Sequence, residues 1–270
     1  MRSFTLLETV EIHKADENNV FLCHITSLSD ELKEEIRFKL ISVCRGLADA
    51  EKRLAAYSYQ RTLLEFLRRY TTKTDDTKKG MIGELLSHIL IRHLITHFSP
   101  ISPFFNMEES SIKKAFDIVF RCSNSGEVWF TEVKSGHKAE QTARQKNNEL
   151  LHLGKRSILA QMNGSELHIW TNAVNGAKLS IVKPNIRDEI ERILSDCFVQ
   201  AQDQEIDTQD FNVVLTSVLY ADDTDPLLFD DVDGVRVNVE GDDLFKNLIV
   251  FSIQKETYEA VERFLLSEAA

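Results

Sequence analysis

Residues 115–134 read AFDIVFRCSNSGEVWFTEVK and predict a β-hairpin. Two runs rich in β-branched and aromatic residues, 115–121 and 127–134, flank Ser123-Asn124-Ser125-Gly126, whose composition is typical of a tight turn. Because a strand points successive side chains to opposite faces of its sheet, the hairpin is expected to sort its residues into two sets by parity.

This parity gathers three charged side chains. A two-residue turn at Asn124-Ser125 pairs residues whose numbers sum to 249 and sets Asp117 opposite Glu132. A turn at Ser125-Gly126 raises the sum to 251 and sets Asp117 opposite Lys134 instead. In both registers Asp117, Glu132 and Lys134 share one face. The opposite, core-packing face is then expected to hold Phe116, Ile118, Phe120, Trp129 and Val133.

Two carboxylates on neighbouring strands lie about 5 Å apart and repel each other, so the group needs a compensating charge. Mg²⁺, or Mn²⁺ in its place, suits the pair, because it takes one or two carboxylates, keeps several waters and accepts phosphate oxygens. Such an ion activates water against a phosphodiester, while Lys134 positions the nucleophile or neutralises developing charge. The alternative is a surface cross-strand salt bridge without catalytic meaning.

The order of the charged residues resembles a known superfamily. An acidic residue on a helix, then Asp, then Glu-x-Lys is the arrangement of the PD-(D/E)xK nucleases, matched here by Glu84, Asp117, Glu132 and Lys134. The longer runs at 79–86, 116–119 and 129–134 resemble the HamA nuclease subunits of Hachiman antiphage defence. The Pro of the superfamily's name is absent, since Phe116 precedes Asp117.

The resemblance implies a restriction-endonuclease-like core that cleaves DNA with a metal ion, together with a partner helicase, HamB. It also implies that Glu84, Asp117, Glu132 and the backbone carbonyl of Val133 hold the metal, and that Lys134 is catalytic. The rival hypothesis is a catalytically inactive nuclease-like fold that serves as a DNA- or helicase-binding subunit. In that case Glu132 and Lys134 form only an ion pair.

The rest of the chain predicts an α/β fold, with a mixed sheet flanked by helices and an α-rich extension over residues 1–75. Ser29 resembles the cap of a helical region that is broken near Gly46, and Thr71–Thr77 predicts a linker. Residues 76–270 form the expected nuclease core. Its further predicted helices are Gly83–Phe98, Lys138–Gly154, Asn185–Val199 and Glu256–Leu266, and its further strands are Ile101–Met107, Leu167–Trp170, Phe211–Tyr220 and Leu248–Ile253.

Charge is distributed unevenly along the chain. The net charge is −11, yet residues 61–160 carry 16 Lys/Arg against 11 Asp/Glu. On the helix predicted after the hairpin, Lys138, Arg144 and Lys146 are candidate contacts to DNA phosphates, and Gln141 and Gln145 are weaker candidates for assisting the site. The acidic insertion at about 196–245 carries 14 Asp/Glu against Arg236 alone. Within it, the segment Asp222–Asp243 is either a solvated loop or a mimic of DNA charge that covers the basic face or a basic partner.

Several classes of protein are excluded by what the sequence lacks. No run approaches the ~20 apolar residues of a membrane helix and no secretion signal is evident, so we expect a cytoplasmic protein without a membrane partner. The scattered cysteines are expected to be reduced and mostly buried. Neither a phosphate-binding loop nor an H-E-x-x-H pattern occurs, so any motor is a partner, and His88, His93 and His97 predict packing rather than zinc.

Overall fold

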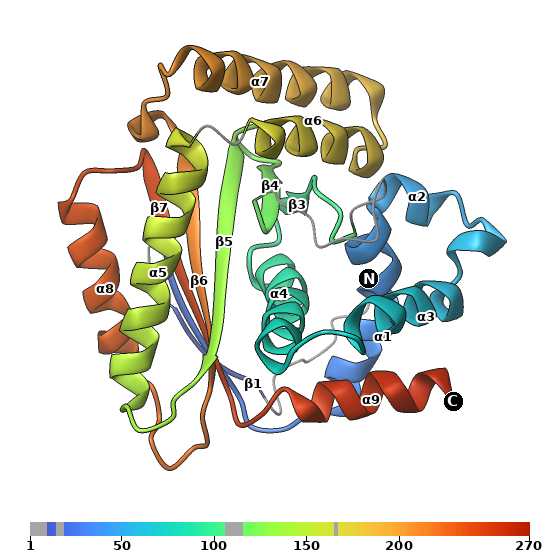
Figure 1. Cartoon of the computed structure of the whole chain (residues 1–270), viewed down its shortest axis with the longest axis vertical. Coiled ribbons are helices and arrows are strands. Elements are labelled where there is room, and N and C mark those ends of the chain that lie inside the picture. The colour runs from blue at the N-terminus through green and yellow to red at the C-terminus, as the bar shows by residue number, and fades with distance from the viewer. Residues whose placement is uncertain (1–9, 15–18, 106–115, 165–166) are drawn as a thin grey trace.

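The computed structural model describes residues 10–14, 19–105, 116–164 and 167–270. Within them one seven-stranded sheet has the order β1-β2-β7-β6-β5-β4-β3, and Figure 1 shows helices on both of its faces. The strands are β1 (Val10–Lys14), β2 (Val20–Ile25), β3 (Phe98–Pro100), β4 (Ile118–Cys122), β5 (Val128–His137), β6 (Asn212–Tyr220) and β7 (Asn247–Lys255). The α/β class is confirmed.

The sheet is parallel in its centre and antiparallel at its edges. β2, β7, β6 and β5 run parallel, whereas β1, β4 and β3 join as antiparallel strands. All nine residues of β6 are buried, as expected for a parallel strand covered on both faces. β2 lies within residues 1–75 and pairs with β7, so this part of the chain contributes to the central sheet as well as helices.

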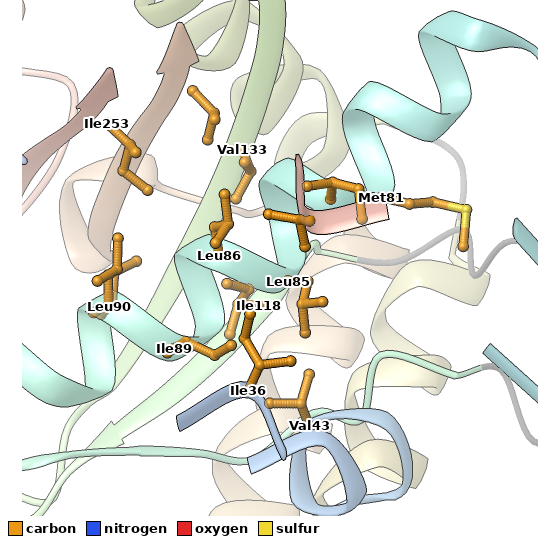
Figure 2. Packing of buried hydrophobic residues seen from close by; sticks show 14 of the residues in the cluster. Ile36, Val43, Met81, Leu85, Leu86, Ile89, Leu90, Ile118, Val133 and Ile253 are labelled. Carbon is orange, nitrogen blue, oxygen red and sulfur yellow. The ribbon is translucent and has the colours of Figure 1, made fainter. Parts of the chain in front are cut away.

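One face of the sheet packs against α1 (Asp30–Arg45), α3 (Tyr59–Tyr70), α4 (Asp75–Leu94) and α9 (Glu259–Ala269). Figure 2 shows this core, where Leu85, Leu86 and Ile89 of α4 lie near Val133 of β5 and Ile118 of β4. The other face packs against α5 (Ala143–Asn163), α6 (His168–Ser180), α7 (Pro184–Asp203) and α8 (Phe229–Gly241). The short α2 (Leu47–Glu51) follows α1.

The predicted hairpin is confirmed in its first register. Ile118 pairs with Thr131 and Phe120 with Trp129, so the residue numbers sum to 249. The turn is longer than predicted, because Cys122 pairs with Glu127 across four residues, and Gly126 has a φ of +80° that glycine adopts without steric cost. Ile118, Phe120, Trp129 and Val133 share one core as predicted. Phe116 does not: it precedes β4 and packs in the opposite core, against Phe130 and Trp170.

Two other predictions are wrong in part. The Thr71–Thr77 linker overlaps the first turn of α4, because Thr74 caps that helix and Asp75 and Asp76 favour its N-terminus; α4 therefore begins eight residues before Gly83 and ends at Leu94. Leu167–Trp170 is no strand but the start of α6. The short apolar run Ile169-Trp170 suits a strand and a buried helix equally, and Ala173 and Ala177 continue the helical spacing.

The acidic stretch 196–245 is neither an insertion nor a solvated loop. It contains the last turns of α7, the buried strand β6 and helix α8. The helix predicted over Lys138–Gly154 is α5, but it begins at Ala143, so that Lys138 precedes it, and it continues to Asn163. The other predicted elements are confirmed within a few residues, and Ser29 caps α1. Of Ile101–Met107, the described part, Ile101–Phe105, forms no strand; Met107 and Ala115 lie outside the described residues.

Candidate functional site

The site lies on β5, where it passes beneath α5. Glu132 is only 1% exposed, and its Oε1 accepts a hydrogen bond of 2.5 Å from Nζ of Lys134. Parity places both side chains on the α5 face. Gly154 of α5 lies directly over them: a Cβ at that position would stand 3.8 Å from Cγ of each residue. The pair is therefore enclosed by a helix on one side and the sheet on the other.

Asp117 joins this pair from the start of β4. Its Oδ2 accepts a hydrogen bond of 2.7 Å from the backbone N–H of Val133, beyond the last β4–β5 rung at Ile118. In an extended strand the N–H and C=O of one residue point the same way. The carbonyl of Val133 therefore points to the strand edge at which the carboxylate of Asp117 lies. The resemblance to the nuclease superfamily predicted that these two groups lie together.

Glu84 approaches from the other face of the sheet. It follows Gly83 on α4, where a Cβ would stand 2.0 Å from Oγ of Ser135 and 3.3 Å from Cβ of Val218. The missing side chain of Gly83 thus lets α4 pack closely onto β5 and β6. Glu84 is half-buried, and its charge reaches Lys134.

The pKa of Lys134 reports how these groups converge. Burial by itself lowers this pKa, but the carboxylates of Glu132, Asp117 and Glu84 together outweigh burial and raise it above its ordinary value of 10.5. Lys134 is therefore a protonated ammonium at neutral pH. The three carboxylates selected from the sequence thus all act on Lys134, and Glu84 contributes least to the shift.

Existing contacts already compensate the expected repulsion between carboxylates. Glu132 accepts from Lys134 and, at 2.9 Å, from Nε2 of Gln161, while Asp117 accepts from the backbone of Val133. The donor set consists of oxygens, which Mg²⁺ prefers, and Mg²⁺ needs only one or two carboxylates. Across the described part of the chain, no three His, Cys, Asp or Glu side chains gather closely enough to cage an ion. The chemistry of the donors thus fits Mg²⁺, without a preformed cage.

The candidate DNA contacts are paired within the chain. Nζ of Lys138 lies 3.0 Å from Asp225, Nε of Arg144 lies 3.2 Å from Asp231, and Nζ of Lys146 lies 2.8 Å from Glu149. Lys146 faces the site side of α5, since its Cε lies 3.0 Å from where a Cβ of Gly136 would be. Lys138 instead pairs with the segment that leads into α8, and Arg144 pairs with the first turn of α8.

Sequence reasoning missed Gln161. Gln141 and Gln145 were the candidates, but Gln141 binds Glu149, and Gln145 forms the capping box of α5 with Thr142. Gln161 lies near the opposite end of the helix, because α5 runs antiparallel to β5 and brings its last turns back over Glu132. The sequence did offer a signal for Gln161: this polar residue stands two helical turns after Gly154, on the side of α5 that faces the sheet.

The fold and the site together define an α/β protein with a carboxylate–amine group on a central strand. The chain belongs to the HamA family, whose model matches residues 3–263. Membership makes it a component of Hachiman antiphage defence. A comparison with curated proteins finds no match. In the described residues, no helix is long and apolar enough to cross a membrane, and the four cysteines are free, three of them buried.

Proposed function

We propose that this chain is a metal-dependent DNA nuclease of the PD-(D/E)xK type, the effector of a Hachiman system that acts with a partner helicase. The observation that carries the proposal is the convergence of Glu132, Asp117 and Glu84 on the ammonium of Lys134. Charges inside a buried sheet are costly unless they are paired, and they occur preferentially at functional sites. Membership of the HamA family supports the same function.

Asp117, Glu132 and the carbonyl of Val133 would hold Mg²⁺, with Glu84 adding negative charge nearby. The bound ion polarises a phosphoryl oxygen and lowers the pKa of a bound water. Lys134, protonated at neutral pH, would donate hydrogen bonds to the phosphate and offset its developing charge. It acts as a cation rather than a base in this scheme. Gln161 would keep the Glu132 carboxylate oriented through its amide N–H.

The test is plasmid and linear DNA degradation by the full chain with Mg²⁺, with and without the helicase partner. Glu132→Ala and Lys134→Ala should abolish cleavage. Glu127→Ala and Lys246→Ala are matched controls, because these residues, which directly precede β5 and β7, form a 2.8 Å Glu–Lys pair outside the site. Equal cleavage by the native chain and all four variants would refute the catalytic assignment.

One observation favours the alternative, a non-catalytic DNA- or helicase-binding subunit. Both carboxylate oxygens of Glu132 already have partners, Lys134 and Gln161. If these bonds are permanent, the group only holds α5 to the sheet. Titration calorimetry with Mn²⁺ distinguishes the two functions: the nuclease binds the ion and Glu132→Ala does not, whereas the binding subunit gives no heat in either case.

A further inference from the structure

The flank of α5 that faces α8 carries a ladder of three ion pairs. Lys138 pairs with Asp225 at 3.0 Å, Arg144 with Asp231 at 3.2 Å and Lys155 with Asp242 at 2.8 Å. We call these six residues the α5–α8 ladder. The partners in each pair are 87 residues apart. This constant offset follows from the topology. The connection from β5 to the parallel strand β6 begins with α5, and α8 connects β6 to the parallel strand β7, so that the two helices lie side by side and run in the same direction (Figure 1).

Backbone contacts hold the acidic side of the ladder in place. Oδ2 of Asp225 also accepts a hydrogen bond of 2.8 Å from the N–H of Ala143, the first residue of α5. On β7, Gln254 donates to the carbonyls of Asp222 and Asp225 and accepts from the N–H of Leu227. The carboxylate of Asp225 is therefore held beside α5 by backbone contacts as well as by its attraction to Lys138.

The ladder contributes little to the docking of α8. Val232, Val235 and Val239 on α8 are buried in the core and fasten the helix there. The ion pairs are much more exposed: the side chain of Arg144 is 69% exposed and that of Asp242 is 49% exposed. Pairs in water stabilise a fold only slightly, so three aligned pairs on one helix flank call for another explanation.

The explanation concerns the cations with which the three carboxylates pair. Lys138 and Arg144 are two of the three residues expected to contact DNA phosphates, and Lys155 continues the same flank past Gly154, which lies over the site. A lysine or arginine that already holds a carboxylate cannot also neutralise a phosphate, so it does not release the cations condensed on the DNA, and this release is what drives non-specific affinity. The carboxylates therefore stand where phosphates would be.

We propose that Asp225, Asp231 and Asp242 act as an internal competitor for the DNA backbone, which weakens DNA binding by the chain because a phosphate must displace each carboxylate from its cation. This inference rests on the proposed function and adds a mode of regulation to it. α8 itself stays docked, and only the ionic partners exchange. The cations beside α5 are then neutralised by the carboxylates in the absence of DNA, and the acidic segment next to them repels DNA.

The experiment measures DNA affinity rather than cleavage. Labelled 20-mer duplexes are titrated with the full chain in EDTA, by fluorescence anisotropy, across a KCl series. Asp225→Asn, Asp231→Asn and Asp242→Asn together should tighten binding about tenfold or more at low salt. They should also steepen the slope of log K against log salt by up to about 2.7, since each new phosphate contact adds about 0.9. Asparagine keeps the size of aspartate and its ability to cap Ala143.

The matched control is Glu189→Gln, Asp196→Asn and Asp203→Asn, three exposed carboxylates on α7 with the same total charge. This control should leave the salt slope unchanged. Equal changes in slope for both triple variants would overturn the inference and leave only an effect of net charge. No DNA binding by any variant would overturn both the inference and the nuclease; equal binding by all, with Mg²⁺-dependent cleavage intact, would overturn the inference alone.

A second variant keeps the test valid if the triple substitution unfolds the chain. Arg144→Gln should barely change DNA affinity in the native chain, because Arg144 is already occupied by Asp231. In the Asp231→Asn background the same change should lower affinity several-fold. An identical effect of Arg144→Gln in both backgrounds would show that the pair does not compete with DNA.

Discussion

The two flanks of α5 use the same kinds of charge in opposite ways. On the β5 flank, Glu132 is 1% exposed and has two donors, Lys134 and Gln161. On the α8 flank, the three ion pairs of the ladder are partly in water, and each cation faces a single carboxylate of the ladder. Burial makes the first group strong and hard to rearrange, whereas hydration makes the second easy to exchange. One helix thus separates a fixed reactive group from an adjustable ionic surface.

The largest expected effect tests the buried flank. Glu132→Ala should lower the rate of DNA cleavage at least about a thousandfold, since it removes the proposed metal ligand and the partner of Lys134, together worth ~4 kcal/mol of transition-state stabilisation. Asp231→Ala on the other flank should leave the turnover rate at saturating DNA within about twofold. Single-turnover kinetics measure both. A comparable loss in both variants would erase the contrast between the flanks.

The next effect concerns the orientation of Glu132. Gln161→Leu keeps the approximate volume but removes the donor to Oε2, and a hydrogen bond to a charged group is worth ~1.5–3 kcal/mol. Cleavage should fall about ten- to a hundredfold, with DNA affinity unchanged. Gln141→Leu is the control, because Gln141 bonds only to exposed Glu149. A Gln161→Leu enzyme with native activity would limit Gln161 to packing.

The close approach of α4 to β5 predicts a loss of stability. In Gly83→Ala the new Cβ meets Ser135 and Val218, and overpacking of this kind costs ~1–3 kcal/mol in the free energy of unfolding. Adding Ser135→Ala, which removes the nearest atom, should restore part of it. Gly80→Ala on the same helix has no atom within 4 Å and should stabilise by up to ~1 kcal/mol. Urea denaturation ranks the three variants.

A smaller effect is expected from breaking one ladder pair. Arg144→Gln should change the free energy of unfolding by less than ~1 kcal/mol, because the Arg144 side chain is 69% exposed and its attraction to Asp231 is screened by water. The same change at Lys134 should cost more, since it leaves the buried carboxylate of Glu132 without its cation. Equal losses in thermal denaturation would mean that the ladder holds α8 in place after all.

The smallest effect is a difference in pH dependence. The backbone N–H of Ala143 and the Lys138 ammonium lower the pKa of Asp225 from its ordinary value of 3.8. Its contribution to stability is therefore present above pH 3.8 and is lost as pH falls through the lower folded value. Lys134 behaves oppositely, because its pKa is raised. Its contribution to stability is fully present below pH 10.5 and is lost as the pH rises through the higher folded value. Asp225→Asn should thus converge with the native chain only in acid, as urea denaturation from pH 2.5 to 6 can check.

Some of this organisation could be predicted because it depends on neighbours along the chain. The alternation of the hairpin allowed two registers, with sums of 249 and 251, and the structure has the first, with Asp117 bonded to the backbone of Val133. The same rule failed at Phe116, which lies before the strand begins and is free to turn to the other core. It also failed at Ile169-Trp170, where a short apolar run fits either a strand or a buried helix.

What the sequence by itself determined is the local pattern: the hairpin, the parity of Glu132 and Lys134, the capped helices, and the excess of acid in 196–245. Only the tertiary structure decided the long-range partners, namely Gln161 on Glu132, Gly83 against Ser135, and the alignment of α8 with α5. The physical reason is that strand and helix periods act over a few residues, whereas contacts between elements depend on how the sheet is ordered and which face each helix covers.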